Sequence, residues 1–226
     1  MMQHPSHDGP GAMQGKSERS YHHGDLRRAV LDTAMDMLVQ DGNWQFTLRE
    51  VARRAGVSHA APYKHFADKT ALLTELALMG FERLEQALRL AATGGDGGIG
   101  GAFAAMARAY LGFGLANPAL YRLMFGAEVA RANGLHREPR AMAAFDLLGD
   151  LLRRGQAAGR IIAGPVPGLA GACWAQLHGL TMLEMDGLLR PEKVGEDAVE
   201  VALATFLNGV LIQGAGTGPG PGMGAT

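Results

Sequence analysis

The sequence predicts an all-α fold, and three observations carry this prediction. Apolar residues recur at spacings of three and four over most of residues 26 to 211, a spacing that lines one face of a helix. No stretch of useful length alternates apolar and polar residues, as a half-buried strand would. Glycine, proline and asparagine interrupt the helical stretches where helices must end. With 226 residues, 47% of them hydrophobic, the chain can bury a sizeable core.

Composition limits the function classes without naming one. The net charge of −1 does not by itself suggest a nucleic-acid partner. A single cysteine, Cys173, excludes an internal disulfide framework and fits a reducing cytosol, and its apolar surroundings predict a buried, unreactive thiol. We expect no metal and no cofactor, because no usual ligand spacing links the histidines near the N-terminus: His4, His7, His22 and His23.

Neither end of the chain predicts a folded element or a membrane anchor. Residues 1–20 and 214–226 are rich in glycine and proline without periodicity, so we expect a disordered arm and a disordered tail. The arm has no apolar core and is not a secretory signal. Residues 161–183 carry no charge, but Pro165, Pro167 and several glycines interrupt them, so we expect a buried helix and no membrane span.

The first helix is predicted from an apolar face that begins near residue 26. Its members are Leu26, Val30, Ala34 and Leu38, and Asp41 with Gly42 ends it. We expect Trp44 and Phe46 to be core residues beneath this helix. The first helix should therefore brace the segment that follows it.

Residues 47–69, TLREVARRAGVSHAAPYKHFADK, are predicted to form two short helices around a turn. Gly56 can take the positive φ that ends the first helix, and Ser58 offers a side-chain oxygen that can start a second one over residues 59–65. Two short helices joined by such a turn form a helix-turn-helix. Val57 and Phe66 should hold the second helix on the first, which leaves small and polar groups outward for a DNA major groove.

Positive charge is concentrated in this segment. Between residues 47 and 69 there are five basic and two acidic residues, a net charge of +3 in a chain whose total is −1. The rest of the chain is therefore negative, about −4 by difference. A local basic surface favours specific docking on DNA over the extended basic surface of a sequence-tolerant nucleoid protein.

The run from Phe46 to Leu73 resembles the DNA-binding domain of the TetR family of bacterial regulators. The resemblance rests on the segments TLREVA, AGVS, YKHF and DKTALL and on their combined spacing. It implies base-reading positions at Arg49, His59, Ala60, Ala61 and Lys64. It implies backbone-contacting positions at Thr47, Ser58, Tyr63, His65 and Lys69. Pro62 departs from the Leu of many members, and we expect the helix to tolerate it because it lies in the first turn.

The segment YHHGDLR, residues 21–27, also resembles the opening of one TetR subgroup. Such an arm can touch phosphate or the minor groove, with Arg27 and Arg28 as the candidate contacts. An equally good interpretation is that Asp25 caps the first helix and that the charges are solvated. The sequence leaves both interpretations open.

Six further helices are expected after the helix-turn-helix. Asp68 should cap a long helix that reaches Arg89, and residues 93–101, TGGDGGIGG, should be a flexible connection. The remaining helices are predicted over 102–115, which Asn117-Pro118 breaks before a continuation over 119–127, and over 140–158, 169–187 and 196–211. The predicted domains are thus 21–67 for DNA binding and 68–213 for regulation and dimerisation.

The second domain is predicted to hold an apolar cavity between its helices, with tyrosine and histidine as its few polar contacts. Stripes of this kind are more often plain core, and the family resemblance is what favours a cavity. The candidate lining residues are Phe103, Tyr110, Phe113, Tyr121, Met124, Phe125, Trp174, His178 and Met182.

The segment WAQLHG, residues 174–179, resembles the C-terminal WHG type of TetR regulator, as does NPALYRLMFG, residues 117–126. In that family the last two helices pair with their copies. A stripe of small residues, including Gly171, Ala175 and Gly179, would let another helix approach closely. We therefore expect a homodimer through about 169–187 and 196–211.

These expectations combine into a ligand-responsive, sequence-specific DNA-binding regulator in the bacterial cytoplasm, bound to the nucleoid when on DNA. By the family resemblance it is a repressor that binds palindromic double-stranded DNA and is released by a small apolar or amphipathic molecule, with the helix after Asp68 carrying the signal. The alternatives are a sequence-tolerant nucleoid-type protein and an enzyme. We expect no catalytic residues, because His178 and Glu184 are poorly aligned on one helix face and no nucleophile, phosphate-binding or metal motif is present.

Overall fold

The structure, a computed structural model, describes residues 23–93, 97–130 and 134–212. Its helices in chain order are α1 (His23–Asp41), α2 (Leu48–Arg54), η1 (Pro62–Lys64), α3 (Lys69–Thr93), α4 (Gly98–Ala116), α5 (Pro118–Met124), α6 (Ala127–Ala130), η2 (Leu135–Arg137), α7 (Pro139–Ala157), α8 (Val166–Met185), α9 (Pro191–Val194) and α10 (Ala198–Val210). In these residues the only β pairing is one isolated antiparallel bridge between Ile161 and Leu211. The expected all-α fold is confirmed.

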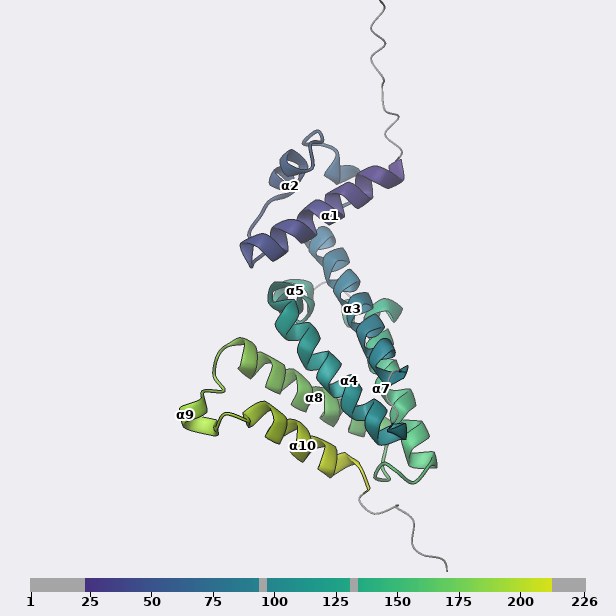
Figure 1. Cartoon of the computed structure of the whole chain (residues 1–226). Helices are drawn as coiled ribbons and strands as arrows, with labels where there is room; N and C mark the ends of the chain where they lie inside the picture. The colour runs from purple at the N-terminus through teal and green to yellow at the C-terminus, as the bar shows by residue number, and fades with distance from the viewer. Residues whose placement is uncertain (1–22, 94–96, 131–133, 213–226) are drawn as a thin grey trace, which may run out of the picture.

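A small head and a larger helical body are joined by α3. Figure 1 shows α1 and α2 at one end of the molecule and α3 running from them into the body, beside α4 and α7. The buried residues of α3 begin with Leu72, Leu73 and Leu76 near the head and continue through Phe81, Leu84 and Leu88 in the body. One helix therefore contributes to the packing of both parts, and the two parts share a continuous hydrophobic core.

Local sequence explains the boundaries of the head. Gly42 and Gly56 take φ values of +67° and +69° at the ends of α1 and α2, where a side chain would be strained. Thr47 and Glu50 form a capping box, with the Thr47 hydroxyl accepting from the Glu50 amide at 3.2 Å and the Thr47 amide donating to Glu50 Oε2 at 2.6 Å. Asp68 Oδ1 accepts from the Ala71 amide at 2.8 Å, so its predicted capping role is confirmed.

The second helix of the head is shorter than predicted. Residues 58–61 form turns, and between residues 58 and 65 the only helical segment is the single 3₁₀ turn of η1. Pro62 has no amide to donate back to Ser58, so the α-helical ladder cannot pass through it. The Ala61 amide instead donates to the Ser58 carbonyl at 2.9 Å, and the expectation that the helix tolerates Pro62 is wrong.

Two predicted boundaries in the body also need correction. α4 begins at Gly98, so residues 98–101 are helical and not a connection, while residues 94–96 of the predicted linker lie outside the described part of the chain. The predicted helix over 119–127 begins at Pro118, whose lack of an amide suits a first turn, and ends at Met124. The short helices α6 and α9 were not predicted, and the predicted arm 1–20 and tail 214–226 lie outside the described residues.

The helices of the body differ in how much they are buried. α4 is long and apolar enough to cross a membrane by length and composition alone, but it packs against α3, α8, α5, α7 and α10 as a core helix. α8 was expected to be a buried helix, yet only one side of it is buried, through Ala170, Cys173, Leu177 and Thr181. Burial raises the pKa of the Cys173 thiol to about 11, as expected for an unreactive cysteine.

Candidate functional sites

Residues with hydrogen-bonding or small side chains cover one exposed surface of the head. Ser58, His59, Ala60 and Lys64 are exposed, and Tyr63 is 51% exposed. These five residues lie on the turn and the 3₁₀ segment that follow α2. Thr47 and Arg49 are also exposed, at the start of α2. We call this set the head surface. Donors on this surface could contact phosphate oxygens, and Arg49 or Lys64 could reach base edges in a major groove.

Two residues that were assigned to DNA lie differently from that expectation. Ala61 is only 6% exposed, so its methyl group belongs to the core and cannot read a base. His65 is half-buried, and its Nε2 atom is buried without a hydrogen-bond partner. Its ring lines a polar groove with Arg27, Glu75 and other residues, and does not point outward to phosphate. Ala61 and His65 therefore lie on the inward side of the segment that follows α2.

Lys69 and the two arginines of the predicted arm have partners within the protein. Lys69 is half-buried, with its Nζ atom 5.7 Å from the centre of the Phe46 ring. Arg27 pairs with Glu75 of α3 at 3.2 Å, and its guanidinium lies 5.6 Å from the centre of the Phe66 ring. Arg28 pairs with Asp32 on its own helix at 3.5 Å. Arg27 is therefore turned toward the body, whereas Arg28 remains on the exposed side of α1.

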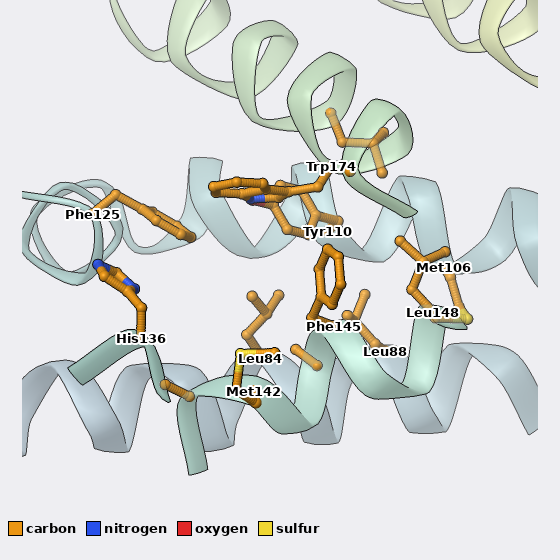
Figure 2. A pocket seen from close by; sticks show the side chains of 14 residues that line it. Leu84, Leu88, Met106, Tyr110, Phe125, His136, Met142, Phe145, Leu148 and Trp174 are labelled. Carbon is orange, nitrogen blue, oxygen red and sulfur yellow. The ribbon is translucent and has the colours of Figure 1, made fainter. Parts of the chain in front are cut away.

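The body contains an apolar cavity of about 380 Å³, within the range of small-molecule sites. Figure 2 shows its wall, with Tyr110 and Trp174 on one side, Leu84, Met142 and Phe145 on the other, and Phe125 and His136 at one end. The lining residues come from α3, α4, α7, α8 and the segments around α6 and η2: Leu84, Leu88, Met106, Tyr110, Phe125, His136, Ala141, Met142, Ala144, Phe145, Leu148, Gly171, Trp174 and Leu177.

Only three of the predicted lining residues belong to this wall, namely Tyr110, Phe125 and Trp174. The other predicted residues, which do not line the cavity, are Phe103, Phe113, Tyr121, Met124, His178 and Met182. Phe103 is stacked on Phe206 of α10, with ring centres 5.4 Å apart, and Met124 is fully buried against α3 at Gly80. Most of the predicted lining residues therefore belong to the core, which is the alternative that the sequence also allowed.

The sequence reasoning missed the contribution of α7. Five of its residues line the cavity, and their spacing of one to four places them on one face of the helix: Ala141, Met142, Ala144, Phe145 and Leu148. This apolar face was visible in the sequence, but α7 carries few aromatic residues and was not considered. Leu84 and Leu88, four apart on α3, were likewise taken only as part of a connecting helix.

Behind the cavity wall, three polar side chains form a hydrogen-bonded row. The Tyr121 hydroxyl donates to the Tyr110 oxygen at 2.9 Å and lies 2.7 Å from His178 Nδ1. Burial lowers the pKa of His178 and raises those of Tyr110, to about 12, and of Tyr121. These groups are therefore neutral at neutral pH. His178 is engaged with Tyr121, so its pairing with Glu184 in a catalytic site has no support.

A second apolar feature lies on α8 and α10. A groove of about 300 Å³ runs between these helices, and its lining includes Ala175, Gly179, Leu183, Ala202 and Phe206. Ala175 is exposed, and a side chain added at Gly171 or Gly179 would meet no atom within 4 Å. Gly171, which was predicted for the dimer, also lines the cavity. In the described residues, no group of three or more His, Cys, Asp or Glu side chains could hold a metal ion.

Two family models match the chain in sequence. Residues 30–76 match the model of "Bacterial regulatory proteins, tetR family", and residues 103–206 match "Tetracyclin repressor-like, C-terminal domain". Together they cover most of the described chain, and each falls on one of the two parts that the fold separates. No curated protein matches the chain.

Solved structures resemble the whole molecule. A protein of unknown function from Rhodococcus sp. RHA1 is 37% identical, with a TM-score of 0.70, and the match covers 86% of this chain and 100% of that one. A TetR family transcription regulator from Marinobacter aquaeolei VT8 is 19% identical, with a TM-score of 0.60 and coverage of 82% and 95%. The fatty acid degradation regulator FadR from Bacillus halodurans is 17% identical, with a TM-score of 0.62 and coverage of 81% and 95%. The last two likenesses concern the fold.

Proposed function

Because this chain belongs to the TetR family of bacterial transcriptional regulators, we propose that it is a sequence-specific repressor that a small, largely apolar molecule releases from its operator. The observation that carries the proposal is the joining of the head surface and the cavity by one helix, α3. Repression is the simplest output, because a protein bound at a promoter blocks the promoter sterically and needs no surface for contacting RNA polymerase. As a DNA-binding regulator it would act in the cytoplasm, at the nucleoid.

In this proposal Arg49, His59, Ala60 and Lys64 face the bases, and Thr47, Ser58, Tyr63 and Lys69 contact the DNA backbone. The assignment is supported by the exposure of these residues on the head surface, apart from Lys69, which is half-buried beside it. His59 and Ala60 offer few hydrogen bonds to bases, so DNA shape would contribute to specificity. Ala61 and His65 are not part of the proposed site, because their reactive or contacting groups are buried.

We infer that two copies associate through α8 and α10. Exposed apolar side chains on these helices, such as Trp174, Leu183 and Val201, support this, as does the groove around Ala175. Two-fold symmetry would then present two heads to successive major grooves of a palindromic site. Such a dimer would bind DNA through two connected heads, so its affinity for DNA would depend on the distance between them.

Replacing Ala175 by glutamate is expected to weaken the dimer, because it places a charge in an apolar contact between helices. Light scattering over a range of concentrations should show monomer mass for A175E where the natural protein shows dimer mass. Leu90→Glu is the matched control, since Leu90 is 66% exposed on α3, away from the groove. A dimer that survives A175E, or a natural protein that stays monomeric, would contradict the proposed interface.

A row of ion pairs offers a route from the cavity to the head. Arg140, next to the lining residue Ala141, pairs with Glu75 of α3 at 2.8 Å and also with Glu82. Glu75 in turn pairs with Arg27 of α1, which lies over Phe66 beside the head surface. The hydrogen bond and charge of Arg140 lower the pKa of the Glu82 carboxyl, so the pair of Arg140 with Glu82 is ionised at neutral pH. A ligand that shifts α7 would thereby shift α1 relative to α3.

Replacing Arg140 by alanine is expected to reduce the coupling between ligand and DNA by about 5-fold or more, near the lower end of common allosteric coupling. A releasing compound is first found by screening neutral apolar molecules. The measurement is then the ratio of the DNA affinity without this compound to the DNA affinity with it. Arg153→Ala is the control, because Arg153 lies on the same helix and pairs only locally with Asp150. Equal ratios in the two variants would exclude the Arg140 route and leave α3 itself as the carrier.

A further inference from the structure

The cavity wall carries no full charge. The described residues that line it include no Asp, Glu, Lys or Arg, and most of the exposed wall is aliphatic or aromatic carbon. An ion moved into such surroundings loses its hydration without gaining a partner, so its transfer is strongly unfavourable. The imidazole of His136 lies at one end of the cavity, where it is exposed to solvent. The interior therefore favours an uncharged ligand.

One residue of the hydrogen-bonded row also lines the cavity. Tyr110 is this residue, and its oxygen accepts a hydrogen bond from the Tyr121 hydroxyl at 2.9 Å. Because Tyr121 gives its hydrogen to Tyr110, the Tyr121 oxygen accepts from Nδ1–H of His178, 2.7 Å away. The row therefore runs in one direction, from His178 through Tyr121 to Tyr110.

This direction decides what Tyr110 offers to a ligand. A phenol oxygen has two acceptor positions and one hydrogen. Tyr121 fills one acceptor position with its own hydrogen, so the hydrogen of Tyr110 is not used in that bond and can be donated to a group in the cavity. Burial raises the pKa of Tyr110 to about 12, so this hydrogen is retained throughout the neutral range. The cavity thus presents a neutral donor within an apolar wall.

We propose that the cavity binds a neutral, apolar molecule carrying one hydrogen-bond acceptor, such as a ketone or ester carbonyl, which takes the hydrogen of Tyr110. Tyr121 and His178 are positioning residues that orient this donor and do not touch the ligand. The inference rests on the proposed function in assuming that the cavity is the effector site. Figure 2 shows room for such a molecule between the end at Phe125 and His136 and the end at Met106 and Leu148.

Binding can be followed through Trp174, which lines the cavity. The chain has two tryptophans, so Trp44→Phe leaves Trp174 as the only reporter of fluorescence. The probes are decan-2-one, decanoate and decylammonium, which share an alkyl chain and differ in charge. We expect decan-2-one to bind at least about 10-fold more tightly than either ion. An ion that binds as tightly as the ketone, or a ketone that does not bind, overturns the assignment of ligand class.

The acceptor is tested with 2-methyldec-1-ene, which has the shape of decan-2-one without its oxygen. The readout is the ratio of ketone affinity to alkene affinity, which we call the preference. Tyr110→Phe should lower this preference about 3- to 10-fold, the range of a single net hydrogen bond. The preference must fall while the alkene affinity stays unchanged. A preference that is unaffected by Y110F shows that another group reads the ligand and overturns the role of Tyr110.

The positioning role predicts a change in selectivity that simple loosening of the fold would not cause. Tyr121→Phe frees an acceptor position on Tyr110, so decan-2-ol, which can donate, should gain in affinity relative to decan-2-one. An unchanged ratio of alcohol to ketone affinity would refute the orientation by Tyr121. DNA release is measured separately with the same ketone. Selective binding without release would refute the effector function and leave the ligand class intact, whereas absence of selective binding refutes the ligand class alone.

Discussion

Replacing Tyr63 by alanine lowers the affinity of the protein for its operator by roughly 10- to 100-fold without lowering its thermal stability. In the proposed complex each head would lose one hydrogen bond to DNA and the contact area of one ring, and a dimer would lose them twice. A net hydrogen bond contributes about 0.5–1.5 kcal/mol. Tyr63 is 51% exposed, so its removal leaves no cavity in the core. The measurement is fluorescence anisotropy with labelled operator at fixed salt.

Val39→Ala is the matched control for this prediction. Val39 is 62% exposed on α1 and belongs to the head without being part of the head surface. Its substitution should leave DNA affinity within about 2-fold, because surface substitutions away from a site have small effects. If Y63A and V39A bind DNA equally well, the head surface does not face DNA through Tyr63.

Replacing Gly114 by alanine destabilises the protein by about 2–3 kcal/mol relative to the same change at Gly112, two residues away on α4. A methyl group at Gly114 would stand 2.3 Å from Thr181 Cγ2 and 3.3 Å from the Tyr121 ring, and both side chains are fully buried. Thr181 is branched at Cβ and cannot rotate freely away, so α4 and α8 must separate. At Gly112 an added methyl group meets nothing within 4 Å and gains helix propensity.

Thermal unfolding of the two variants measures this difference directly. In a chain of this size, 1 kcal/mol shifts the melting temperature by about 2–4 °C, so G114A should melt roughly 4–12 °C below G112A. Both variants change glycine to alanine within α4, so the effect of helix propensity cancels in the difference between their melting temperatures. The difference then reports the close approach of α4 to α8. Equal melting temperatures would show that these helices are not packed as closely as described.

Much of the fold follows from local signals in the sequence. The apolar face of α1, the capping residue Asp68 and the ends at Gly42 and Gly56 each act within a few residues, so their effects can be read without the tertiary structure. The start of α4 at Gly98 is different. Glycine is a poor helix former alone, and helix over 98–101 depends on packing of the body that no local pattern reveals.

The candidate sites were less predictable, for two physical reasons. At the head, the segment after α2 forms turns and one 3₁₀ turn instead of a longer helix, and the burial of Ala61 and His65 depends on how this segment packs. In the body, residue type does not tell whether an aromatic ring lines a cavity or fills the core behind it. Tyr110 and Tyr121 illustrate this, since they share a hydrogen bond but only Tyr110 lines the cavity. That distinction depends on how five helices pack together.

The proposed function requires that this regulator recognise a particular DNA sequence with two heads. The test is to select bound duplexes from a random-sequence pool with the purified protein at two salt concentrations. We expect enrichment of one two-fold symmetric sequence, whose half-sites are about one helical turn apart or a multiple of it. We also expect Y63A to lose this enrichment. Binding without enrichment of any sequence, or enrichment that Y63A retains in full, would contradict the proposed function and favour a sequence-tolerant DNA-binding protein.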